Sequence, residues 1–140
     1  MKMFSFKLFQ IIIWLLLINS FPIFSQTDKE IVEKIFSKIE LGMETGKIEL
    51  FSPYLMETVY IGFQSKIADY FSKEQAYYVL QDYIVELNLQ KVKTLKKKIS
   101  GNSPFISGKL ISVNVVDKLH YFISLKYENG SWKIFQIIID

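Results

Sequence analysis

The period-two pattern of residues 89–139 constrains the fold of this chain more than any other feature. Apolar and polar side chains alternate there in four segments separated by turn-forming residues, which predicts antiparallel strands with one buried face. The predicted strands are Leu89 to Ser100, Phe105 to Asn114, Lys118 to Tyr127 and Ser131 to Ile139. Asn129-Gly130 joins the last two, and this pair favours the positive φ angles of a tight hairpin turn. We therefore expect a meander of long strands.

Two amphipathic helices are predicted before this meander. From Asp28 to Met43, apolar residues recur at helical spacing, namely Ile31, Ile35, Phe36, Ile39 and Met43. Ser72 opens the second helix, because its hydroxyl can cap the backbone while Gln75, three residues on, completes a capping box. The predicted buried stripe of this helix comprises Ala76, Val79, Leu80, Tyr83, Ile84 and Leu87.

The segment between the helices predicts shorter elements. Ile48 to Leu55 is expected to form a helical turn around Phe51, bent near Pro53, and Thr58 to Phe63 and Lys66 to Tyr70 read as two short strands. Helices followed by a run of strands are typical of the α+β class. We therefore expect N-terminal helices packed on one face of a curved, mainly antiparallel sheet of about six strands.

This order of elements resembles the nuclear transport factor two-like superfamily, a cone-shaped α+β fold. The resemblance rests on the helix start Phe71-Ser72-Lys73-Glu74-Gln75-Ala76 and on the final strand with Gly130-Ser131-Trp132-Lys133-Ile134. The chain looks most like a branch of small secreted bacterial proteins classed only as a domain of unknown function. The resemblance implies a pocket between helices and sheet. No catalytic motif of the ketosteroid isomerases or scytalone dehydratases in this superfamily can be matched here, so no residue role is carried over.

The first twenty-five residues predict export. Lys2 and Lys7 precede an unbroken apolar run from Ile11 to Ile18, which is shorter than the ~20 residues of a membrane-spanning helix. We expect a signal peptide over residues 1–25, cleaved after Ser25 or, alternatively, after Ser20, and a single domain over residues 26–140. The mature chain is then expected in the periplasm or outside the cell, without stable insertion in the membrane.

Composition excludes several classes of function. The chain has no cysteine and one histidine, His120, so we expect no metal site and no cofactor. All 17 basic residues are lysines, and two of them lie in the leader, which leaves fifteen against fourteen acids. Because neither a strong positive charge nor the bidentate fork of arginine is present, we expect no binding of nucleic acid.

Few side chains are candidates for acid–base catalysis. His120 alternates with Leu119, Tyr121, Ile123, Leu125 and Tyr127, which should face the core, so it is predicted on the outer face with Phe122, Ser124 and Lys126. Asp69 and Tyr70, just before the second helix, form the remaining catalytic candidate, provided that burial raises the carboxylate pKa. The alternative for Asp69 is a solvated or capping residue in a turn.

Other residues are candidates for binding. Tyr60, Tyr83 and Tyr121 could line a pocket for a ligand, or could simply belong to the core. A lysine cluster comprises Lys91, Lys93, Lys96, Lys97 and Lys98. Its charges alternate across both faces of a predicted strand, which marks an exposed or edge strand. Binding of anionic envelope material is the functional alternative, although neither arginine nor interleaved aromatic residues support it.

The final strand is apolar on both predicted faces. Trp132, Ile134 and Ile138 are expected on one face, and Phe135, Ile137 and Ile139 on the other. The second face, extended by Phe122 and by Val113 or Val115, could pair with a second copy across the outer sheet face. The alternative is that a loop or the first helix covers that face.

Two hypotheses about function follow. The favoured one is a non-catalytic exported module that binds a small apolar ligand or a protein partner, since the interior is aromatic and no catalytic constellation is found. The alternative is a cofactor-independent isomerase or dehydratase that uses the Asp69 carboxylate and a tyrosine.

Overall fold

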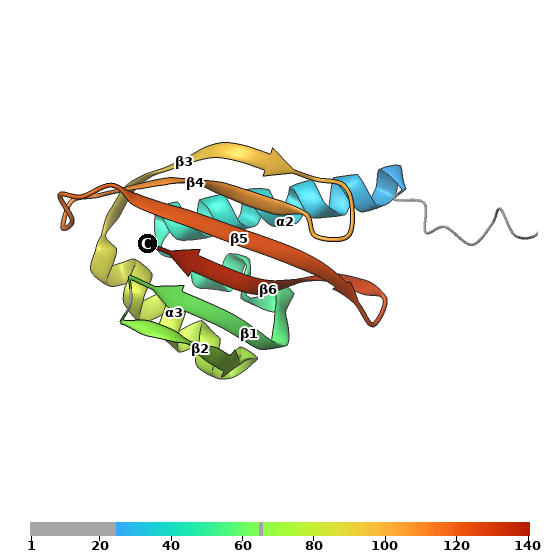
Figure 1. The fold of residues 1–140 in the computed structure, drawn as a ribbon, viewed down its shortest axis with the longest axis horizontal. Coiled ribbons are helices and arrows are strands. Elements are labelled where there is room, and N and C mark those ends of the chain that lie inside the picture. Colours follow the sequence, from blue (N-terminus) through green and yellow to red (C-terminus); the bar gives the residue numbers. More distant parts are fainter. Residues whose placement is uncertain (1–24, 65) are drawn as a thin grey trace, which may run out of the picture.

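The computed structural model describes residues 25–64 and 66–140, which form two layers (Figure 1). Within these residues, six strands form one curved sheet in the order β2-β1-β6-β5-β4-β3, and only the β1 and β6 pair is parallel. Two long helices pack on the same face of this sheet. The elements are α2 (Gln26–Thr45), η2 (Ile48–Leu50), η3 (Ser52–Tyr54), β1 (Leu55–Phe63), β2 (Ile67–Ser72), α3 (Lys73–Leu87), β3 (Leu89–Lys98), β4 (Phe105–Ser112), β5 (Leu119–Glu128) and β6 (Ser131–Ile139). The predicted α+β architecture is confirmed.

Helix α2 begins earlier than predicted because Ser25 caps it. The Ser25 hydroxyl accepts from the Asp28 backbone N–H at 3.2 Å, and the Asp28 carboxylate accepts from the Ser25 N–H. Asp28 Oδ1 also accepts from Trp132 Nε1 at 3.0 Å, which ties the start of α2 to β6. These hydrogen bonds, that of Trp132 foremost, lower the pKa of Asp28. The rest of the predicted signal peptide lies outside the described residues.

The buried stripe of α2 differs from the predicted one at its first residue. Val32 is fully buried, whereas Ile31 is 42% exposed. The other buried apolar residues are Ile35, Phe36, Ile39 and Met43, as expected. Ile31 lies about a quarter turn from the centre of this stripe, so helical spacing from Ile35 alone was not sufficient to place it inside.

Helix α3 has the predicted start. The Ser72 hydroxyl accepts from the Gln75 N–H, and the Gln75 side chain accepts from the Ser72 N–H, each at 3.2 Å. Its buried residues are Ala76, Leu80, Ile84 and Leu87, while Val79 and Tyr83 are only half-buried. No helix within the described residues is long and apolar enough to cross a membrane.

The final hairpin is confirmed, but the predicted faces of Ile137, Ile138 and Ile139 in β6 are wrong. Asn129 and Gly130 both have positive φ angles, of 50° and 80°, as the predicted turn requires. A bulge follows in β6, because Ile134 pairs with Leu125 whereas Gln136 pairs with the preceding residue of β5. The extra residue changes the alternation. As a result, the side chains buried in the core are Trp132, Ile134, Ile137 and Ile139, and Ile138 lies on the outer face.

Strand β5 has the predicted register for most of its length. Leu119, Tyr121, Ile123 and Leu125 are buried, and His120 is exposed on the outer face, as predicted. Tyr127 was expected in the core but is 53% exposed, since it lies near the end of the hairpin, with its ring edge against Trp132. Ser124 pairs with the outer residue Gln136, yet it is almost fully buried.

Candidate functional site

A pocket of about 340 Å³ opens between α3 and the ends of several strands. Its apolar wall consists of Phe63, Ile67, Tyr83, Leu87 and Val115, and its polar rim consists of Gln64, Lys66, Glu86 and Asn114. Two further hollows, of about 420 and about 460 Å³, lie beside the β5–β6 hairpin and beside the start of α3, and one of them is wide open to solvent. An apolar wall with a few polar groups is typical of small-molecule sites.

A stacked pair of rings lines this pocket. Phe63, at the end of β1, is buried, and its ring lies parallel to that of Tyr83 with centroids 3.9 Å apart. The Tyr83 hydroxyl oxygen is buried and has no hydrogen-bond partner within residues 25–64 and 66–140. Burial, and secondarily the charge of Glu86, raises the pKa of Tyr83. The hydroxyl is therefore neutral at neutral pH and has no partner among the described residues.

Side chains at the end of β4 and in the β4–β5 connection form hydrogen bonds to the last turn of α3. The Asn114 amide donates to the Glu86 carbonyl at 2.8 Å, and the Ser112 hydroxyl donates to the Leu87 carbonyl. The Asn114 N–H in turn donates to the Ser112 hydroxyl at 3.0 Å. Carbonyls in the last turn of a helix lack intrahelical partners. These hydrogen bonds therefore satisfy the end of α3 and fix one wall of the pocket.

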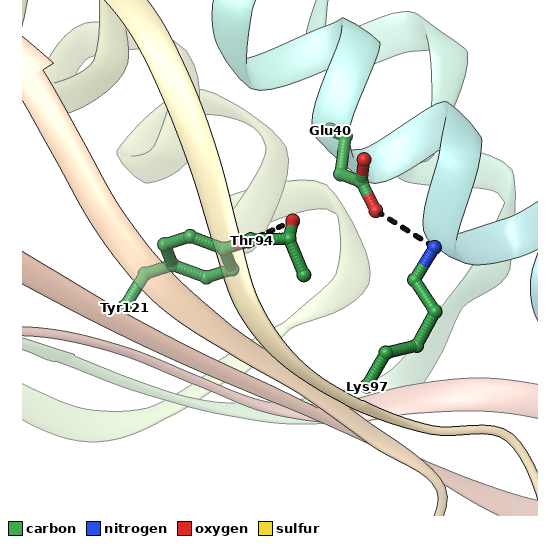
Figure 2. Close-up of polar contacts among 4 residues, drawn as sticks. All are labelled: Glu40, Thr94, Lys97 and Tyr121. Carbon is green, nitrogen blue, oxygen red and sulfur yellow. Dashed lines mark hydrogen bonds and ion pairs between the residues drawn. The ribbon is translucent and has the colours of Figure 1, made fainter.

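A second polar cluster lies near the opposite edge of the sheet, on the same face and under α2 (Figure 2). The Tyr121 and Thr94 hydroxyl groups are hydrogen bonded at 2.5 Å, and Lys97 Nζ lies 3.4 Å from Glu40 Oε1. The register places Gly108 of β4 between Tyr121 of β5 and Thr94 of β3. Because Gly108 has no side chain, the Tyr121 ring can cross the middle strand. Burial raises the pKa of Tyr121 and Glu40 adds to this effect, while the Thr94 hydrogen bond opposes it.

Helix α2 is held to the edge strand by this cluster. Glu40 Oε1 is buried without a hydrogen bond, but its ion pair with Lys97 gives it a charged partner. One turn along the helix, Glu44 Oε2 accepts from the Val92 N–H of β3 at 3.0 Å. The Glu44 carboxylate thereby covers a backbone donor on the outside of an edge strand, which would otherwise be open to pairing.

The three candidate tyrosines do not share one site. Tyr83 lines the pocket, whereas Tyr121 is buried in the cluster under α2. Tyr60 lies on the outer face of β1, where its ring packs edge-on against Tyr70 at 5.2 Å. Alternation could have separated Tyr60 from the core, because Val59 and Ile61 beside it are buried. Phe63 was not predicted from the sequence as the stacking partner of Tyr83.

The catalytic candidates Asp69 and Tyr70 lie on the exposed edge strand β2. Both are exposed, and Asp69 Oδ1 accepts from the backbone N–H of Tyr70 at 2.7 Å. The burial that the acid–base hypothesis required is therefore absent at Asp69. Within the residues that the structure describes, no group of three or more His, Asp or Glu side chains could hold a metal ion.

The fold is that of the nuclear transport factor two-like proteins. A nuclear transport factor two-like protein of unknown function from Cytophaga hutchinsonii has 10% sequence identity and a TM-score of 0.54, over 78% of this chain and 88% of that chain. A candidate ketosteroid isomerase from Kribbella flavida has 16% identity and a TM-score of 0.58, over 80% of this chain and 78% of that chain. At such identities the likeness concerns the fold alone.

The family is narrower than this fold. Residues 36–140 match the family model described as a domain of unknown function, DUF4783, and this chain belongs to that family. A family member from Bacteroides ovatus has 20% identity and a TM-score of 0.66, over 74% of this chain and 92% of that chain. No curated protein matches the sequence. The resemblance to a superfamily branch of unknown function is thus confirmed.

Proposed function

We propose that this chain is an exported, non-catalytic module that binds a small, largely apolar ligand in the pocket beside Tyr83. The observation that carries the proposal is the Tyr83 side chain itself. Its ring forms part of the apolar wall, while its buried hydroxyl has no partner among the described residues. Leaving such a group unsatisfied costs about 1–3 kcal/mol, so a ligand that accepts a hydrogen bond there recovers free energy on binding.

The size and lining of the pocket define the class of ligand. A volume of about 340 Å³ is at the lower end for small-molecule sites. Phe63 and Val115 contact the apolar body of such a ligand, and a single acceptor group faces Tyr83. Lys66 and Glu86 at the rim carry opposite charges, so the rim itself does not select for charge.

The ligand can be identified by mass spectrometry of organic extracts from protein purified from its native envelope. We expect one small apolar compound in stoichiometric amount. Binding at the pocket is then tested by fluorescence titration with 1-anilinonaphthalene-8-sulfonate. Val115→Trp fills the pocket and should weaken binding of this probe about tenfold or more.

Val113→Trp is the matched control for this titration. Val113 belongs to the same connection but is 56% exposed and does not line the pocket. It should therefore leave probe affinity unchanged. Equal affinity for both variants and the parent protein, together with an extract that contains no small molecule, would contradict the proposal.

Export is part of this proposal and rests on the amino-terminal pattern of Lys2, Lys7 and the apolar run. Ser25 adds a physical difference between the two cleavage sites. Cleavage after Ser20 retains the residue that caps α2, whereas cleavage after Ser25 removes it, and a lost N-cap costs about 1 kcal/mol. Amino-terminal sequencing of the protein recovered from the envelope decides between them. A retained Met1 would contradict export.

Two earlier hypotheses stay predictions. The isomerase or dehydratase hypothesis used Asp69 and a tyrosine, and Asp69 does not line this pocket; Glu86 is the carboxylate among its lining residues. The homodimer across the outer sheet face also stays a prediction, although the β6 bulge changes which residues could form its interface. Ile137 and Ile139 are buried within the monomer, so they cannot contribute to such an interface.

A further inference from the structure

A bulge in β3 gathers the lysine cluster onto one face of the sheet. Val92 and Thr94 pair with Leu110 and Gly108, which are buried beneath the helices. The register shifts between Thr94 and Lys96, so that Leu95 is the extra residue. The lysines on the outer face are therefore Lys91, Lys93, Lys96 and Lys98, and Lys97 alone turns inward to Glu40. The charges thus divide four to one between the faces rather than evenly, and the predicted edge position of this strand is confirmed.

Neighbouring strands add aromatic rings to these charges. Phe105 of β4 and Phe122 of β5 are half-buried on the outer face, with ring centroids 5.2 Å apart. Lys96 Nζ lies 5.8 Å from the centroid of the Phe105 ring. Lys109 pairs with Lys93 on one side and with His120 on the other. The interleaved aromatic residues that the sequence lacked locally are thus supplied by β4 and β5.

Charge is segregated between the two layers of the molecule. Strands β3 to β6 contain eight lysines and one carboxylate, Glu128, which lies at the end of β5. Helices α2 and α3 contain eight carboxylates and four lysines. The near-neutral net charge of the domain hides this separation. Among the described residues, the outer lysines of β3 and β4 form no ion pair, although Asp140 lies beside His120 of β5, which pairs with Lys109.

We propose that this basic sheet face, formed by Lys91, Lys93, Lys96, Lys98, Lys109 and the Phe105–Phe122 pair, docks peripherally on an anionic phospholipid bilayer. Lysine ammonium groups on long flexible stems suit a diffuse anionic surface, whereas arginine forks suit an oriented site. The phenylalanine rings between them can contact the acyl boundary. A second copy fits less well, because pairing two such faces would bring like charges together.

Cosedimentation with lipid vesicles tests this proposal. Vesicles that contain phosphatidylglycerol should bind the purified protein at about 0.1 M salt, and binding should be largely lost at about 1 M salt. Pure phosphatidylcholine vesicles should not bind it. The combined variant Lys93→Glu, Lys96→Glu and Lys109→Glu should weaken binding about tenfold or more. Because these side chains are on the outer face, circular dichroism should show an unchanged fold.

A variant of equal charge outside the basic sheet face is the matched control. Lys29→Glu, Lys34→Glu and Lys47→Glu together change net charge by the same amount and should leave most of the binding. Equal losses in the two variants would overturn the proposal, because they would reflect net charge alone. So would equal binding to both kinds of vesicle, binding to soluble polyglutamate but not to vesicles, or a dimer in sedimentation that the sheet-face variant dissociates.

Discussion

Two buried tyrosine hydroxyl groups, at opposite ends of one row of residues in the sheet, differ in their hydrogen bonding. The row crosses the inner face of the sheet from Phe63 through Ile139, Tyr121 and Gly108 to Thr94. At the β3 end, the tyrosine hydroxyl is hydrogen bonded and α2 is held down by two carboxylates. At the β1 end, the hydroxyl of Tyr83 above Phe63 has no partner among the described residues.

This difference gives the two buried hydroxyl groups opposite effects on stability within one core. A buried hydroxyl with a partner adds to the free energy of unfolding, whereas a buried hydroxyl without one lowers it. The β3 end therefore adds to stability, and the β1 end contains the hydroxyl that the proposed ligand would satisfy. Of the candidate tyrosines, Tyr121 thus stabilises the fold, and Tyr83 is the one on which the proposed binding site rests.

The largest expected effect comes from adding a side chain at Gly108, where the backbone of β3 comes closest. A Cβ at Gly108 would overlap the carbonyl oxygen of Lys93 and lie 2.9 Å from its carbonyl carbon, so Gly108→Ala must push β3 away from β4. We expect a loss of about 3 kcal/mol or more in the free energy of unfolding, measured with urea.

Gly62→Ala is the control on another strand. A Cβ there meets no atom closer than 3.6 Å, so stability should change by about 0.5 kcal/mol or less. If the two alanine variants were equally stable, the close approach of β3 at Gly108 would not be a constraint on the fold.

A smaller loss is expected at the rim of the pocket. Ser112→Ala removes the donor to the Leu87 carbonyl and the acceptor for the Asn114 N–H, which should cost about 1–2 kcal/mol. In the same variant, hydrogen exchange of the backbone amides at the end of α3 should become faster. Ser107→Ala, on the outer face of β4, should change neither quantity. Loss of stability without faster exchange in α3 would contradict the assigned role of Ser112.

Alkaline pH should lower the free energy of unfolding through the tyrosines at both ends of the row. Burial raises the pKa of Tyr83 and of Tyr121, so the folded state holds these protons more tightly than the unfolded state. Their contribution to stability is complete below about pH 10 and is lost as the pH rises through the folded-state values. In urea unfolding at a series of pH values, Tyr83→Phe should therefore lose less stability above pH 10 than the parent protein. An identical alkaline loss would contradict the burial of Tyr83.

Much of the fold could be predicted because local signals agreed with the tertiary structure. The Ser72–Gln75 capping box and the Asn129-Gly130 turn are set by neighbouring residues, and both occur as expected. The bulges near Leu95 and Phe135 could not be predicted. Each adds one residue to a strand and reverses the faces of all later side chains. A single sequence carries no reliable signal for such an insertion.

The candidate site was harder to predict than the fold. Tyr83 was found as an aromatic residue at helical spacing, but its partner Phe63 comes from a strand twenty residues earlier. Asn114 was placed inside a predicted strand, whereas it lies in the connection that forms the rim. Asp69 was singled out for its residue type and its position just before the second helix, and its exposure depends on β2 being a sheet edge.

The comparison between the two ends is tested most directly by removing one oxygen from each. The free energies of unfolding of Tyr121→Phe and Tyr83→Phe should be measured side by side in urea at neutral pH, in protein stripped of bound small molecules. Tyr121→Phe should lose about 1–2 kcal/mol because Thr94 loses its partner, and Tyr83→Phe should lose nothing or gain up to about 1 kcal/mol. A loss in Tyr83→Phe as large as that in Tyr121→Phe would contradict the account, because the hydroxyl beside the pocket would then already be satisfied within the protein.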